Sequence, residues 1–156
     1  MCRAVSDAVL LALQSHESSA QYEALKFAFA CECAARVRHL LEDERVIRCL
    51  DILAAYVKGE ADRGALDQAA AEAMALANRH QGSRSLDGVG HAAVSASYAV
   101  ANALAGRAVQ AADYAAYAAV YGAGGYGAVC DPESFAAERD WQRTTLERVA
   151  NALATR

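Results

Sequence analysis

The chain has 156 residues, of which 55% are hydrophobic and 22% are charged, and its formal net charge is −4. This balance is typical of one soluble globular domain over residues 1–156 and argues against a disordered chain. Acidic and basic residues are spread over both halves, so no basic stripe is available for a phosphate backbone, and we expect no nucleic-acid partner.

Alanine dominates the composition, with 40 residues, whereas Pro132 is the only proline. Alanine has the highest helix propensity because its side chain loses no rotamer freedom in a helix and buries no polar atom. The composition therefore predicts an all-α fold. We expect a compact bundle of about seven helices, in which alanine-rich antiparallel helices pack closely.

The first predicted helix begins near Ser6 and ends near Ser15. Asp7 precedes its apolar run and no small-residue cleavage pattern follows, so we expect a helix here and not a signal peptide. Ser19 is the predicted N-terminal cap of a second helix, whose apolar residues recur every three or four positions over 22–40. Apolar side chains on two faces predict that this helix lies near the centre of the bundle.

Acidic residues at 42–44 predict the start of a third helix, because carboxylates near a helix start interact favourably with the positive end of its dipole. Gly59 ends this helix. Asp62 is the predicted cap of a fourth helix, which ends at Gly82.

Ser85 is the predicted cap of a fifth helix, which runs to Leu104. The break at 105–107 is so short that a sixth helix, to about Tyr121, must fold back beside the fifth. Their facing alanines favour the short end of the usual ~8 to 10 Å separation between helix axes. Residues 88–106 are uncharged, but they include serine, histidine and asparagine, so we expect a buried helix and no membrane span.

Glycines within residues 122–127 have the G-x-G-x-x-G spacing of a pyrophosphate-binding turn. That motif requires a preceding strand, whereas a helix is predicted before these residues, so we expect a plain flexible loop. Asp131 and Pro132 then predict the start of the last helix, with aspartate as cap and proline in the first turn. This helix extends to Leu153.

No group of residues has a recognisable catalytic or metal-binding pattern. The five cysteines lie mostly in predicted helices, as expected of reduced thiols in a cytoplasm, and their spacing does not form the two pairs of a metal site. The four histidines are scattered and form no HExxH or nucleophile motif. We therefore expect no metal, no cofactor and no catalysis.

Tyrosines gather late in the chain. Tyr114, Tyr117 and Tyr121 are spaced to project from one side of the sixth helix, and Tyr126 follows. Tyrosine offers a large, stiff contact area with a polar tip, which suits a binding surface. The same stripe suits the edge of a core, and both interpretations remain open.

Acidic residues are densest at the start of the third helix. Glu42, Asp43 and Glu44 are followed by three further acids over residues 51–62. This face would attract a basic partner, or it is simply a solvated surface. The candidate partner-binding residues are therefore Tyr117, Tyr121, Tyr126, Glu42, Asp43 and Glu44.

Four segments carry a resemblance to a known family: residues 31–37, 48–60, 90–93 and 137–142. In these the chain resembles the immunity proteins of bacterial polymorphic toxin systems, in their alanine-rich, all-helical group. The closing segment, with Glu138, Arg139, Trp141 and Gln142, is the most specific. The chain departs from the pattern at 95–98, where a further histidine would be expected, and residues 114–127 are peculiar to it.

The resemblance implies a cytoplasmic protein that binds a cognate toxin stoichiometrically and neutralises it without catalysis. Two alternatives remain open. One is a small-molecule-binding or enzymatic domain with a pocket between helices, using His91 with Asp140 and Trp141. The other is a self-associating module, in which the alanine-rich helices of residues 89–121 form the seam of a homodimer.

Overall fold

The computed structural model describes residues 3–80 and 89–156, and within these ranges the chain forms seven α-helices, two short 3-10 helices and no strand. The elements are α1 (Arg3–Gln14), α2 (Tyr22–Arg36), η1 (Arg38–Leu40), α3 (Glu44–Val57), α4 (Arg63–Arg79), α5 (Val89–Leu104), α6 (Ala108–Val129), η2 (Pro132–Phe135) and α7 (Ala136–Ala154). The predicted all-α class and the number of helices are confirmed.

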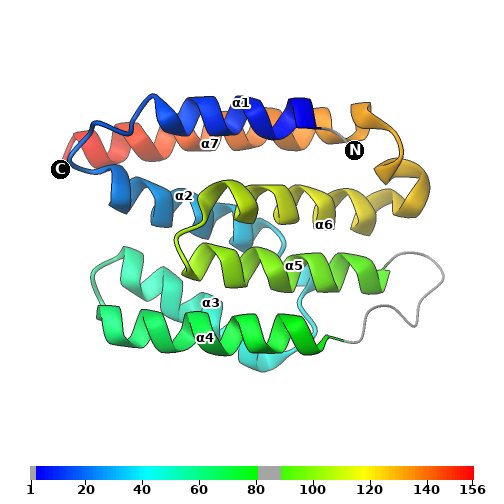
Figure 1. Cartoon of the computed structure of the whole chain (residues 1–156), viewed down its shortest axis with the longest axis horizontal. Coiled ribbons are helices and arrows are strands. Elements are labelled where there is room, and N and C mark those ends of the chain that lie inside the picture. Colours follow the sequence, from blue (N-terminus) through cyan, green and yellow to red (C-terminus); the bar gives the residue numbers. More distant parts are fainter. Residues whose placement is uncertain (1–2, 81–88) are drawn as a thin grey trace.

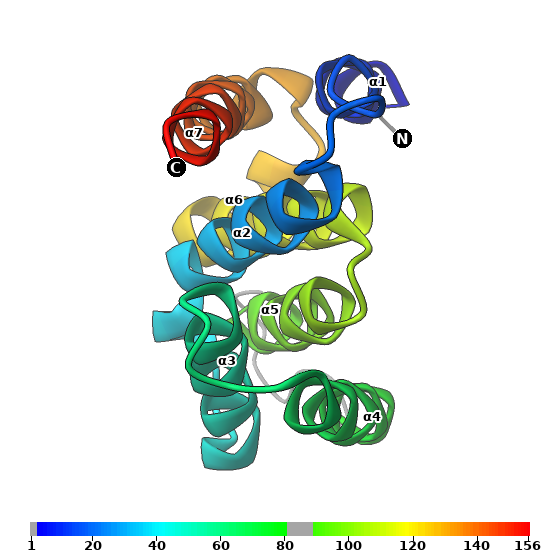
Figure 2. The ribbon, with the colours of Figure 1, turned by 90° about the vertical axis from the view of Figure 1, so that its left-hand side faces the viewer.

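The helices are stacked in layers (Figure 1). Figure 2 shows α1 and α7 in one outer layer, α2 and α6 in the next, and α3 and α4 on the far side of α5. As predicted, α2 is central, since it packs against α3, α5, α6 and α7. None of the helices in the described ranges is long and apolar enough to cross a membrane.

Aspartate side chains cap both α3 and α4: the predicted cap at Asp62 is confirmed, and at the predicted start of α3 it is Asp43 that caps the helix. The Arg45 N–H donates to Asp43 at 2.9 Å, and the Ala65 N–H donates to Asp62 at 2.8 Å. Gly59 follows α3 with φ +77°, a left-handed conformation that ends a helix. The predicted Gly82 stop and Ser85 cap lie outside the described residues.

Ser19 does not cap α2 as predicted. Its hydroxyl accepts a hydrogen bond of 3.2 Å from the N–H of Gln21, and Gln21 is the residue that precedes the helix. The reason is a short turn at residues 15–21, in which the Tyr22 N–H donates to the Ser19 carbonyl at 3.1 Å. Ser19 therefore stabilises the turn before α2.

Alanines on α5 and α6 face each other inside the molecule. Ala96 on α5 and Ala112 on α6 are fully buried, and Gly106 makes the tight reversal between the two helices with φ +75°. A Cβ at Gly106 would lie 3.1 Å from the Phe27 ring, so α2 also packs closely against this turn. The alanine-rich faces of α5 and α6 are therefore buried within a single chain.

Residues 122–127 are not the predicted loop. α6 continues through them to Val129, and only Gly125, with φ 63° and ψ −152°, leaves helical geometry and kinks the helix. Periodicity missed this because the cost of glycine in a helix is about 1 kcal/mol per residue, which tertiary packing can offset. Here the Tyr121 and Tyr126 rings, on either side of the kink, pack together with centroids 5.5 Å apart.

The last predicted helix begins in two stages. Asp131 accepts a hydrogen bond of 3.0 Å from the Glu133 N–H and caps η2, with Pro132 in its first turn. α7 proper starts at Ala136. The predicted cap is confirmed, but it caps the 3-10 turn before the helix.

Candidate functional site

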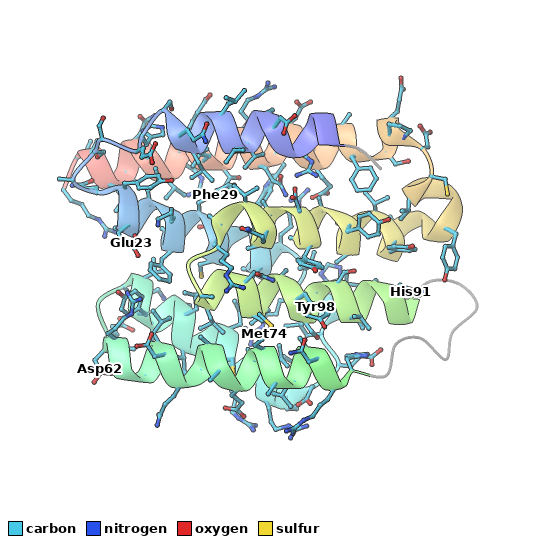
Figure 3. The ribbon with its side chains drawn as sticks, in the orientation of Figure 1. Glu23, Phe29, Asp62, Met74, His91 and Tyr98 are labelled. Atoms are coloured by element: carbon cyan, nitrogen blue, oxygen red, sulfur yellow. The ribbon has the colours of Figure 1, made fainter. Side chains whose placement is uncertain are left out.

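Five aromatic side chains meet where α5 begins and α6 ends, and we call them the aromatic cluster: His91, Tyr117, Tyr121, Tyr126 and Phe135. The Tyr121 ring stacks on the His91 imidazole at a centroid distance of 5.5 Å. Tyr126 packs edge-on against His91 at 5.3 Å and against Tyr121 at 5.5 Å. Tyr117 extends the cluster, at 5.1 Å from Tyr121 and 5.7 Å from Phe135. Figure 3 shows His91 at the end of α5 that lies beside the last turns of α6.

Hydrogen bonding fixes the exposed edge of this cluster. The Tyr126 hydroxyl is hydrogen-bonded to Nε2 of His91, although 52% of the Tyr126 side chain is exposed. Burial, followed by the neighbouring Tyr117 and Tyr126 hydroxyls, raises the pKa of Tyr121. The Tyr121 phenol therefore stays neutral at physiological pH, and the cluster presents aromatic rings with polar tips.

Glycines in the last part of α6 bring Tyr126 back to His91. The positive φ at Gly125 changes the chain direction immediately before Tyr126. At Gly124, a Cβ would stand 2.6 Å from the Cβ of Ala128, so a larger residue cannot fit without a shift. The glycines that resembled a phosphate-binding turn thus shape an aromatic surface.

Tyr114 does not belong to the aromatic cluster. Its ring stacks on Tyr98 at 5.2 Å, and the Tyr98 hydroxyl donates to Asn78 at 2.8 Å. Because α5 and α6 are antiparallel neighbours, the pairs His91–Tyr121 and Tyr98–Tyr114 lie seven residues apart on both helices. Matched seven-residue spacings on the two helices were the sequence signal that could have identified these pairs.

The three candidate acids at 42–44 are partly neutralised within the chain. Asp43 pairs with Arg45 at 2.8 Å, and hydrogen bonds from the Arg45 side chain and backbone lower the pKa of Asp43. Glu42 lies 3.6 Å from Nε2 of His80. Glu44 is exposed in the first turn of α3.

Leu40 packs against the last turns of α6, since a Cβ at Gly122 would lie 3.2 Å from Leu40 Cδ2. The acidic run that follows Leu40 leads to the start of α3, where Glu42 lies beside His80 at the end of α4. In Figure 1 the end of α6 and the start of α5 lie together at one end of the molecule, whereas α3 begins nearer its middle. We call the end that carries the aromatic cluster the aromatic end.

The closing sequence segment joins α7 to α2. Glu138 accepts two hydrogen bonds from Arg36, at 2.8 and 3.0 Å. The Arg36 guanidinium in turn lies over the Trp141 ring, 4.2 Å from its centroid. Sequence reasoning missed Arg36, because it lies 102 residues from Glu138 and no local pattern links them.

The same segment also joins α7 to α6. Arg139 donates to Asp113 at 3.0 Å, and the Gln142 side-chain amide donates to the Ala112 carbonyl at 2.8 Å. Gln142 is 1% exposed, so this hydrogen bond is buried. We call Glu138, Arg139, Trp141 and Gln142 the α7 clasp, since their contacts hold the fold together.

The grouping of His91 with Asp140 and Trp141 is not formed. Trp141 packs under Arg36, Asp140 pairs with Arg143 at 3.0 Å, and His91 belongs to the aromatic cluster. The sequence interpretation failed because it rested on residue type without the distance between α5 and α7. Within residues 3–80 and 89–156, no three histidine, cysteine or acidic side chains are grouped to hold a metal ion.

A groove of about 780 Å³ lies between α2, α3 and α7. Its lining includes alanines of α2, the Phe27 ring and the charged residues Lys58 and Arg148. Cys31 also lines it, and burial, with Glu32 adding to it, raises the pKa of this thiol to about 11. A thiol with this pKa stays protonated and is a poor nucleophile. The groove has the volume of a small-molecule site without an activated nucleophile at Cys31.

The fold and the site together define an all-helical protein with an alanine-rich interior and an aromatic surface cluster at one end. The chain matches the family described as Imm-5 like putative immunity protein over residues 12–149, and it belongs to this family. The resemblance to immunity proteins is thus confirmed. No curated protein and no solved structure matches the chain.

Proposed function

We propose that the protein binds a cognate protein toxin in the cytoplasm and neutralises it stoichiometrically, without catalysis, through its aromatic end. Membership of an immunity protein family supports the toxin as partner. The observation that supports this surface is Tyr126, whose side chain is 52% exposed while its ring is held by His91 and Tyr121. A large aromatic side chain that is already ordered contributes contact area at a low entropic cost.

The surroundings of Tyr126 suit a binding hot spot. Tyr117 and Tyr121 are partly buried next to it, and Glu42 and Glu44 are exposed a few residues after Leu40, which contacts the last turns of α6. Strong anchors in protein interfaces are aromatic and lie inside a polar rim that excludes water. Here the tyrosines are the anchors, and the acidic residues of the 42–44 run are part of the rim.

Co-expression with the product of the neighbouring open reading frame tests the proposal. We expect the protein to rescue growth, and Tyr126→Ala to weaken the complex roughly thirtyfold, corresponding to a loss on the order of 2 kcal/mol at a hot spot. Tyr22→Ala is the matched control, because Tyr22 begins α2 at the opposite end of the bundle, near Glu23 in Figure 3. If no neighbouring gene encodes a toxic product that the protein rescues, the proposal is wrong.

The groove supports a second candidate function, the binding of a small molecule, because its volume of about 780 Å³ lies in the range of ligand sites. Ala24→Trp separates the two, since Ala24 is exposed and lines the groove. Binding through the aromatic end predicts that this variant still rescues growth. Loss of rescue with an intact fold would transfer the binding site to the groove.

The alanine-rich surface suggested as a homodimer contact is not available to a second copy at Ala96 and Ala112, because both are buried within one chain. A homodimer would need another surface. Light scattering across a dilution series measures the mass directly, and a dimer that persists on dilution would reinstate this alternative.

A further inference from the structure

We propose that the aromatic end receives an arginine side chain of its protein partner, with the guanidinium over the exposed tyrosine rings and close to flanking carboxylates. This inference rests on the proposed function and adds the chemistry of the partner surface. A guanidinium is attracted to the negative face of an aromatic ring and stacks on it because it is planar and weakly hydrated.

The first support comes from the aromatic side chains that already carry a cation. Lys26 lies 4.9 Å from the Tyr22 centroid, Arg36 lies 4.2 Å from that of Trp141, and Arg63 lies 5.5 Å from that of Phe27. These three rings lie on α2 and α7. Among the described residues, no lysine or arginine lies over Tyr121 or Tyr126, although Tyr126 is the more exposed of the two.

The second support is the charge of the segment that carries these rings. Residues 108–138 contain four acidic residues and no lysine, arginine or histidine, although Asp113 and Glu138 pair with Arg139 and Arg36 from outside the segment. Asp131 and Glu133 are the other two. Aromatic rings on a stretch with acidic residues and no basic ones are complementary to a cationic partner.

The third support is the position of the carboxylates. Asp131, which caps η2, and Glu133 on η2 are exposed, and η2 packs against α6 through the contact of Phe135 with Tyr117. Carboxylates are thus present on the element that packs beside the cluster, and a guanidinium can form hydrogen bonds with a carboxylate while its plane lies on a ring.

The test uses the protein alone, with N-acetylarginine amide as the probe and the neutral analogue N-acetylcitrulline amide as its control. We expect the arginine probe to produce saturable NMR shifts at Tyr121 and Tyr126, and the citrulline probe to produce none. Tyr22 is an internal control, because Lys26 already lies over its ring. Equal shifts with both probes, or no shifts with either, would overturn the inference.

Variants separate the ring from the charge. Tyr126→Phe keeps the aromatic face and should retain arginine binding, whereas Tyr126→Leu should abolish it. Glu133→Gln should weaken the arginine probe several-fold, and added salt should then have a smaller effect on the variant than on the wild type. If Tyr126→Leu binds the arginine probe as the wild type does, the inference is wrong.

The same variants distinguish this inference from the proposed function. Loss of toxin rescue in Tyr126→Leu, without arginine-specific shifts in the wild type, would leave the toxin-binding site in place and remove the arginine. Arginine-specific shifts combined with full rescue by Tyr126→Leu would contradict the proposed toxin-binding surface instead.

Discussion

Single residues at the kink in α6 decide where Tyr126 lies. Gly125 has φ 63° and ψ −152°, a conformation that side-chain-bearing residues hardly ever adopt, and Gly124 lies against Ala128. Gly127, two positions later, has nothing within 4 Å of its Cβ position. The three glycines therefore differ: Gly125 has a backbone conformation that favours glycine, Gly124 lacks space for a side chain, and Gly127 has neither constraint.

We expect Gly125→Ala to lower the free energy of unfolding by about 1 to 3 kcal/mol, because alanine is strained at this backbone geometry. Gly127→Ala is the matched control and should raise the stability by about 0.5 to 1 kcal/mol, since alanine suits a helix better than glycine. Urea unfolding measures both. Equal effects of the two substitutions would show that the kink does not need glycine.

Asp43 makes stability depend on pH in the acid range. Hydrogen bonds from Arg45 lower its pKa in the folded protein below the ordinary value of 3.8. A carboxyl with a depressed folded pKa stabilises the fold above its unfolded pKa, and this contribution is lost as the pH falls through the folded pKa. The stability advantage of wild type over Asp43→Asn should therefore be present near neutral pH and disappear in acid. An advantage that stays constant in urea titrations down to low pH would contradict this.

At the scale of elements, small side chains allow α5 and α6 to pack closely. Ala96 on α5 and Ala112 on α6 are fully buried, and the reversal at Gly106 holds the two helices side by side. The absence of charged residues from 88–106, which predicted a buried helix, has the same origin. An uncharged helix is needed wherever all its faces are covered by other helices.

We expect Ala96→Leu and Ala112→Leu each to cost about 1 to 3 kcal/mol, because the added atoms must push the helices apart. Ala137→Leu, at an exposed position of α7, serves as the control and should change stability by less than about 0.5 kcal/mol. Thermal melts monitored by circular dichroism compare the three. Unchanged melting of both buried variants would show that these alanines do not face a neighbour.

At the scale of the whole molecule, the most specific family segment and the proposed binding surface are separate. The α7 clasp joins the outer layer to α2 and α6 through Arg36, Asp113 and the Ala112 carbonyl. The aromatic end lies at α5 and the last turns of α6 (Figure 3). The residues that carry the family resemblance most specifically and the residues that we propose to bind a partner are therefore different.

Gln142→Leu tests this division. It removes both the buried hydrogen bond to the Ala112 carbonyl and the side-chain oxygen that accepts from Arg139, which should cost about 1 to 3 kcal/mol. Hydrogen exchange should become faster in α7, while exchange in α3 and α4, on the far side of α5, should stay near its wild-type rate. Arg143→Leu, at an exposed residue that pairs with Asp140, should alter neither. Uniformly faster exchange in Gln142→Leu would mean that the clasp supports the entire fold.

The sequence by itself determined the all-helical class, the number of helices, the acidic start of α3, the cap at Asp62 and the stop at Gly59. These features depend on helix propensities and on hydrogen bonds between residues a few positions apart, so short stretches of the sequence are enough to predict them. Family membership was also visible there, through the closing segment.

Only the tertiary structure decided that α6 passes through its glycines, that His91 meets Tyr121 and Tyr126, and that Leu40 packs against the last turns of α6. Each depends on the register in which antiparallel helices lie against one another. Alanine stripes specify that register weakly, because one methyl group resembles the next. The few large aromatic and charged side chains select it, and their partners lie far away along the chain.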